Sequence, residues 1–245
     1  MSRFMPLARS VLSSPAWFVP FDEYALRVRA AGVTARLDRW DDGIWVPQDT
    51  LAVRTPSGAL AYPALGRRAE PLVAQPVRHR ARFSAPGYEP LYPADDQPFD
   101  ADVTGVEFLV YPNNDDHPPA VRTEPRVVRM LPGAGFPYPP GTRTVQGVVV
   151  DAATGAPAVN VLVEAEGQTS LEAEPWHERT LSDIRGAFRL SLRWEGEKTG
   201  GGTTGQPLVE TFRLRATQRP GRTGSLVVRA PEELGRRQVI EIREQ

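Results

Sequence analysis

Cysteine is absent from the chain, and its absence excludes several kinds of protein. Without it there is no disulfide scaffold, no thiol nucleophile, and no zinc or iron–sulfur site with thiolate ligands. Lysine is nearly absent too, because Lys198 is the one lysine among the 29 basic residues and the rest are arginine. Arginine pairs with carboxylates in a planar, bidentate way, so this bias fits either a GC-rich genome or contacts between proteins.

A charge excess of one sign and long apolar runs are also lacking. The formal net charge of −1 creates no overall field that would draw the chain to nucleic acid. No run approaches the roughly 20 apolar residues of a membrane helix, so we expect no membrane span. Residues 11–21 are interrupted by Ser13, Ser14, Pro15 and Pro20, unlike the core of a signal peptide. We therefore expect a cytoplasmic protein that later becomes part of an assembled particle.

Proline and glycine are abundant instead, with 25 and 21 residues. Proline lacks a backbone donor and glycine weakens helices, so both favour strands, turns and extended connectors. The stretch 131–142 holds four prolines and three glycines, which makes it a stiff spacer rather than a helix or a central strand. We expect Phe136 and Tyr138, which lie within it, to pack against a neighbouring surface.

This spacer divides the chain into predicted parts. Residues 1–21 form an N-terminal arm, 22–130 a first β domain, 131–142 the connector, and 143–245 a second β domain. The arm is apolar without a strict period, so it either covers the first domain or docks into a partner. The residues predicted to contact a partner are Phe4, Leu7, Leu12, Trp17, Phe18, Phe136 and Tyr138.

Alternating apolar residues predict strands throughout the second domain. Residues 144–151 alternate and are β-branched. Residues 187–194 are expected to form a strand with Ser191 outward and an inward row of Phe188, Leu190, Leu192 and Trp194. Residues 159–165 are expected to form a second strand with Val159, Val161 and Val163 on one face. Turns are predicted at Gly155 and at 182–186, and residues 195–205 are predicted to form a loop. Short strands at this spacing favour a β-sandwich.

The second domain resembles a known family at these turns and strands. Its segments fit the patterns G-x-V-x-D, G-x-P, V-x-V and T-D-x-x-G-x-F, with serine in place of the threonine. The matching residues are Gly147, Val149, Asp151, Gly155, Pro157, Val161, Val163, Ser182, Asp183, Gly186 and Phe188. Residues 143–245 thus resemble the carboxypeptidase regulatory-like, or transthyretin-like, family. The resemblance implies a β-sandwich fold and no particular ligand. The His-x-x-Glu motif of zinc carboxypeptidases does not occur, so the resemblance implies no peptidase activity.

The first domain shows a weaker form of the same pattern. Residues 55–65 look like the same turn and strand, and residues 79–88 look like the strand that often follows. This domain is either a divergent second copy or an unrelated β domain. The predicted fold class is therefore all-β: two small antiparallel β-sandwich domains, transthyretin- or immunoglobulin-like, with a connector and an extended arm. This layout is also similar to that of accessory proteins of phage-tail-like contractile injection systems.

The sequence contains no recognisable catalytic set. His79, His117 and His177 are far apart along the chain, and no metal or cofactor is predicted. Acidic residues gather at 95–102 and at 113–116, where turns are favoured over calcium binding because neither cluster has EF-hand spacing. Trp40 and Trp45 flank carboxylates, as in some glycan sites. However, the Asp-Gly dipeptide between them favours a β-hairpin.

Two hypotheses about function follow. The first is a non-catalytic structural or adaptor subunit of a multi-protein particle, such as a phage tail or contractile injection system. Its partners would be other protein subunits, with a symmetric oligomer as one arrangement, and it would not be an enzyme. The alternative is a carbohydrate- or ligand-binding module that uses the faces of Trp40, Trp45 and Trp176.

Overall fold

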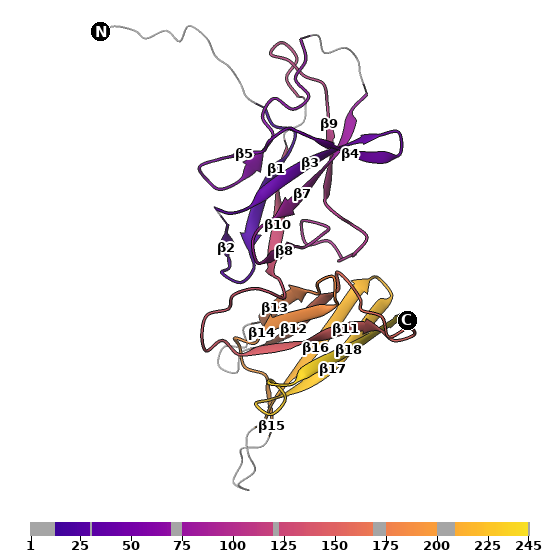
Figure 1. The fold of residues 1–245 in the computed structure, drawn as a ribbon. Coiled ribbons are helices and arrows are strands. Elements are labelled where there is room, and N and C mark those ends of the chain that lie inside the picture. The colour runs from indigo at the N-terminus through magenta and orange to yellow at the C-terminus, as the bar shows by residue number, and fades with distance from the viewer. Residues whose placement is uncertain are drawn as a thin grey trace, which may run out of the picture. The chain divides into compact units, whose positions relative to one another are not determined.

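The computed structural model describes residues 13–29, 31–69, 75–119, 123–168, 175–199 and 209–244. Every regular element in these ranges is a strand (Figure 1). The described strands form three sheets. Among the strand pairs whose residue register is determined, one is parallel and all the others are antiparallel. This confirms the predicted all-β fold class. A helix long and apolar enough to cross a membrane is not found in these ranges.

The first two sheets are built mostly from the N-terminal half of the chain. In spatial order, one contains β5 (Val53–Arg54), β6 (Leu60–Ala61), β1 (Trp17–Asp22), β10 (Pro125–Pro132) and β8 (Tyr88–Pro90), while β2 (Arg27–Val28) pairs with β1. The other contains β4 (Ile44–Gln48), β3 (Thr34–Asp41), β7 (Val77–Ser84) and β9 (Val106–Val110).

The third sheet contains the C-terminal strands. Its order is β13 (Pro175–Leu181), β12 (Leu162–Gln168), β16 (Val209–Arg219), β17 (Arg222–Ala230), β18 (Arg237–Glu244), β11 (Thr144–Asp151) and β14 (Ala187–Ser191), and β15 (Glu197–Thr199) pairs with β16. The β11–β18 pair is the parallel one. Strand β11 has the bounds that its alternating, β-branched sequence predicts.

The chain divides into two compact units. The first comprises the residues up to Pro20 together with Val28–Phe83 and Gly105–Val127. The second comprises Phe21–Arg27, Ser84–Thr104 and the residues from Val128 onward. This division does not test the domain boundaries predicted from the sequence, which stay a prediction.

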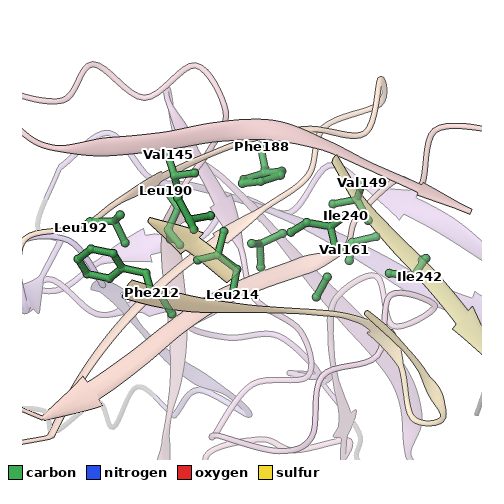
Figure 2. Close-up of a cluster of buried hydrophobic side chains, with 14 of the residues drawn as sticks. Val145, Val149, Val161, Phe188, Leu190, Leu192, Phe212, Leu214, Ile240 and Ile242 are labelled. Atoms are coloured by element: carbon green, nitrogen blue, oxygen red, sulfur yellow. The ribbon is translucent and has the colours of Figure 1, made fainter. Parts of the chain in front are cut away.

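The main core of the second unit comes from the inward rows of its strands. Figure 2 shows these apolar side chains pointing toward one another from several strands. The fully buried members include Val145, Val149, Val161, Leu190, Leu192, Leu214 and Ile242. Burying one such side chain stabilises the fold by about 1.5–3 kcal/mol. The alternation that was visible in the sequence therefore supplies the core directly.

Three local predictions in this unit are wrong. Trp194 is 40% exposed, because β14 ends at Ser191 and the inward row continues only to Leu192. Ser191 is buried instead of exposed, and its hydroxyl donates a hydrogen bond to the Glu178 carboxylate at 2.7 Å. Val159 is 42% exposed because Asn160, at φ 53°, turns the chain before β12 begins.

The loop predicted at residues 195–205 also needs a correction. Residues 197–199 form strand β15, which pairs with β16 from Glu197 opposite Thr211 to Thr199 opposite Val209. Strand formation here depends on a neighbour that lies distant in sequence, so local composition did not indicate it. Gly155, in contrast, has the positive φ of 70° that the predicted turn requires, which confirms that turn.

Candidate functional site

The first unit contains a buried carboxylate held by two arginines. Along β7, alternate residues point to one face of the sheet, which places Arg80 and Arg82 on the same side as Asp38 of β3. The Arg80 guanidinium donates to Asp38 at 2.8 and 3.0 Å, and that of Arg82 donates at 2.7 and 2.8 Å. Asp38 is only 1% exposed. Burial by itself raises the pKa of Asp38, but the hydrogen bonds and charges of Arg82 and Arg80 outweigh it and the pKa is lowered.

Two tryptophans lie beside this clamp on a hairpin. Trp40 of β3 is directly opposite Trp45 of β4, and their ring centroids are 4.9 Å apart in an edge-to-face arrangement. The Arg80 guanidinium lies 4.6 Å from the centre of the Trp45 ring. The turn residues Asp42 and Gly43 both have positive φ, at 43° and 90°, as a two-residue hairpin turn requires. The predicted hairpin is confirmed.

The third tryptophan of the sugar-binding hypothesis lies elsewhere. Trp176 is 7% exposed and belongs to the core of the second unit, with its ring 6.4 Å from that of Phe212. Its face is therefore not a stacking platform on the surface. Sugar binding by Trp40 and Trp45 stays a prediction, although the Arg80 guanidinium already lies against one of these rings.

The terminal strands of the first two sheets expose apolar side chains. Strand β4 ends the four-stranded sheet and carries Ile44, which is 64% exposed. Strand β5 ends its own sheet and carries Val53, 52% exposed, just after Leu51 at 81%. An edge strand presents unpaired backbone N–H and C=O groups, so apolar residues there make it suited to pairing with another chain.

The aromatic residues of the connector pack inside the second unit. The Phe136 ring lies 5.0 Å from the ring of Tyr88, 5.2 Å from that of Tyr24 and 4.7 Å from that of Tyr138. The Tyr138 hydroxyl donates to the Arg189 carbonyl at 3.2 Å, and burial raises the pKa of this phenol. The expectation that these two residues fix the connector to a neighbouring surface is confirmed. Whether they contact a partner stays a prediction.

A second buried carboxylate joins distant parts of the same unit. Glu23 is 8% exposed and forms ion pairs with Arg129, at 2.9 Å, and with Arg179. Arg129 also pairs with Asp96. Sequence inspection missed both this cluster and the Asp38 clamp. The signal for the clamp in the sequence is the arginine at every second position of β7. Asp38 of the neighbouring strand β3 lies on the same sheet face as these arginines.

The residues predicted in the N-terminal arm divide into two groups. Phe4, Leu7 and Leu12 lie outside the described residues. Trp17 and Phe18 begin β1, where Phe18 is fully buried and its ring lies 5.1 Å from that of Phe83. Partner binding by any of these residues stays a prediction.

The histidines and acidic loops have local partners. His79 is buried beside the Val77 carbonyl, and His177 contacts Glu164 at 3.0 Å. The Asn114 side chain accepts a hydrogen bond from the backbone of His117, as in a turn. Within the described ranges, no three histidine or acidic side chains are grouped so that they could hold a metal ion.

No protein-family model matches this chain, and no curated protein matches its sequence. Among solved structures, a streptococcal ancillary pilin is similar at 14% identity and a TM-score of 0.28, over 94% of this chain and 62% of the pilin chain. The Bacillus anthracis TIE protein is similar at 9% identity and a TM-score of 0.26, over 94% of this chain and 33% of its own. BcpA, the major pilin subunit of Bacillus cereus, is similar at 12% identity and a TM-score of 0.27, over 93% of this chain and 68% of the BcpA chain.

This chain thus spans less than two thirds of the length of the first two structures. Such low TM-scores assign neither a family nor a function. The fold assignment rests on the strand pairing itself. The carboxypeptidase regulatory-like and injection-system resemblances stay predictions.

Proposed function

We propose that this chain is a non-catalytic structural or adaptor subunit of a multi-protein assembly. The observation that carries the proposal is the pair of terminal strands β4 and β5, which expose Ile44 and Val53, with Leu51 exposed just before β5. Added strands at open sheet edges are a common way for β proteins to bind one another, since main-chain hydrogen bonds provide affinity and side-chain pockets provide specificity.

The more specific proposal is that this assembly is a phage tail or a contractile injection system. It rests on the layout of β domains, connector and apolar N-terminal residues in the sequence. Other subunits of the particle would be the partners, with a cytoplasmic stage before assembly. The N-terminal arm and the two open edges would then be the contact surfaces.

The test is the native mass of the protein and the identity of co-purifying proteins from its source. We expect tube, sheath or baseplate subunits to co-purify with the full chain and to be lost when residues 1–21 are deleted. A Leu51→Lys/Val53→Lys variant should also lose them, because two charges oppose burial of the β5 edge.

Ile184→Lys is the matched control. Ile184 is 81% exposed in a turn and does not lie at either sheet edge, so this variant should keep its partners. A wild-type chain that stays monomeric with no structural subunits bound would overturn the proposal. If Ile184→Lys lost its partners while Leu51→Lys/Val53→Lys kept them, the assignment of the partner contact to the β5 edge would be refuted.

A further inference from the structure

Arginines gather on the outward face of three neighbouring strands. Strands β16, β17 and β18 lie side by side in the third sheet (Figure 1), and all three belong to the second unit. Their even-numbered side chains, such as Phe212, Val228 and Ile240, are buried in the main core. Alternation along a strand therefore turns the odd-numbered side chains to the opposite, outward face. The arginines exposed on this face are Arg213, Arg215, Arg229, Arg237 and Arg243.

These five arginines have no acidic partner in the described part of the chain. None of them forms an ion pair there, whereas Arg219 at the end of β16 pairs with Glu244. Glu241 is exposed on the same face and forms no ion pair with a described residue either. Arg213 and Arg215 are two positions apart on one strand, about 7 Å, so their charges repel each other. Because the whole chain has a net charge of −1, this excess of positive charge is local, and carboxylates from another molecule would offset the repulsion.

A hollow of about 610 Å³ on this face is lined by two of the arginines. Arg215 of β16 lines it directly opposite Ser225 of β17. Arg243 of β18 lines it directly opposite Thr223 of β17. Since β17 lies between β16 and β18, the two guanidinium groups border the hollow from either side and the two hydroxyls lie between them. Guanidinium and hydroxyl groups are hydrogen-bond donors, so this set of groups suits a carboxylate.

A glycine allows the two sides of the hollow to approach each other. Gly224 of β17 lines the hollow, and a Cβ on it would lie 2.1 Å from the carbonyl oxygen of Glu241 in β18. Glycine is therefore required for the two backbones to lie this close. The close approach keeps the β18 side of the hollow, with Glu241 and Arg243, next to the β17 side.

Apolar side chains on the same face indicate a protein as the partner. Val239 lines the hollow and is 51% exposed, and Val227 is 48% exposed directly opposite Arg213. Covering these valines is favourable for a partner that has apolar groups beside its charges. None of the described residues that line the hollow is aromatic, so a nucleic-acid base or a sugar would find no ring on which to stack.

We propose that the outward face of β16, β17 and β18 binds an acidic segment of another protein, with one carboxylate in the hollow between Arg215 and Arg243. The two guanidinium groups donate to that carboxylate, and further carboxylates of the segment meet the other three arginines. Apolar side chains of the segment cover Val227 and Val239. Glu241 opposes binding, because its charge has the same sign as the ligand's. The inference rests on the proposed role in a protein assembly, and it names the chemistry that one partner brings.

The test uses the purified full-length chain labelled with ¹⁵N, in which the backbone N–H signal of Ser225 is assigned by triple-resonance NMR. The probes are N-acetyl-Gly-Glu-Val-Glu-Gly-amide, the same peptide with glutamine in place of glutamate, and a thymidine oligonucleotide. At low ionic strength we expect the acidic peptide alone to shift the Ser225 signal to saturation. The R215Q/R243Q variant should bind it roughly fivefold more weakly, since two exposed charge pairs are lost. The E241Q variant should bind it about twofold more tightly, because a like charge is removed.

R27Q/R185Q is the matched control, because it makes the same change in net charge at two exposed arginines that do not line the hollow. It should bind the acidic peptide like the wild type. The proposal is overturned if the acidic peptide causes no saturable shift, if the glutamine peptide or the oligonucleotide binds as tightly, or if R215Q/R243Q binds unchanged. Because the peptide is added to the isolated chain, a failure here is distinct from a failure to co-purify with assembly subunits.

Discussion

At the scale of single residues, buried carboxylates paired with arginines connect strands that are distant in sequence. Asp38 accepts four hydrogen bonds from Arg80 and Arg82, and Glu23 is paired with Arg129 and Arg179. Removing one partner of such a pair leaves the other charge with poor solvation, which costs more than the pair contributes. These contacts therefore specify which strands meet.

The Asp38 clamp predicts a pH dependence of stability. Its folded-state pKa is below the unfolded value of about 3.9, so the clamp stabilises the fold above that pH and loses its contribution as the pH falls through the folded pKa. At pH 7 we expect Asp38→Asn to lower the free energy of unfolding by about 2 kcal/mol. Urea unfolding of both proteins from pH 7 to pH 2 should show this difference shrinking below about pH 4. A difference that stays constant would contradict the assignment.

At the scale of elements, the parallel pair of β11 and β18 depends on a close approach of two backbones. A Cβ on Gly147 would lie 2.3 Å from the Gln238 carbonyl oxygen and 2.8 Å from Cε1 of Phe188. The Phe188 ring belongs to the main core, so neither neighbour is free to move. Glycine at this position is therefore required by packing.

We expect Gly147→Ala to destabilise the second unit by about 3 kcal/mol, because overpacking in a tight core displaces backbone and side chains. Gly235→Ala is the matched control, since a Cβ added there would meet no described atom within 4 Å and the φ of Gly235 is not in the left-handed region. Chemical denaturation of both variants checks this. An equal effect of the two substitutions would mean that backbone entropy, not the close approach, governs position 147.

At the scale of the whole molecule, the second compact unit contains more than the C-terminal sandwich. The main core draws all its buried members from residues 145–242. A smaller cluster joins Leu162 and Leu181 to Leu91, Phe99 and Leu131. The sandwich predicted at residues 143–245 thus has a complete main core, yet part of its apolar surface is covered by residues that precede it.

This division predicts how fragments behave. A fragment of residues 143–245 should fold but unfold at a lower temperature than one of residues 128–245. The longer fragment restores the packing of Leu131 against Leu162 and Leu181 and the hydrogen bond from Tyr138 to Arg189, although it lacks Tyr24 and Tyr88. Burial of Leu131 alone corresponds to about 2 kcal/mol. Thermal unfolding followed by circular dichroism measures the difference. Equal midpoints would show that residues 128–142 add nothing to the sandwich.

The sequence by itself determined the fold class, strand β11 and the inward residues of β14 in the second unit. Period-two alternation placed Phe188, Leu190 and Leu192 inward, because adjacent side chains on a strand point to opposite faces. It also located the positive-φ turn at Gly155 and the Asp-Gly hairpin turn, because few residues tolerate those backbone angles. These are local effects, and local sequence is sufficient to predict them.

Only the tertiary structure decided which polar residues are buried and where the strands end. Asp38 is buried because arginines some 40 positions later in the chain cover it, and Trp194 is exposed because β14 ends before it. Strand β15 forms because β16 continues past the residues that pair with β12 and offers a neighbour there. Pairing between distant segments depends on register and twist across a whole sheet, and no single stretch of sequence encodes that.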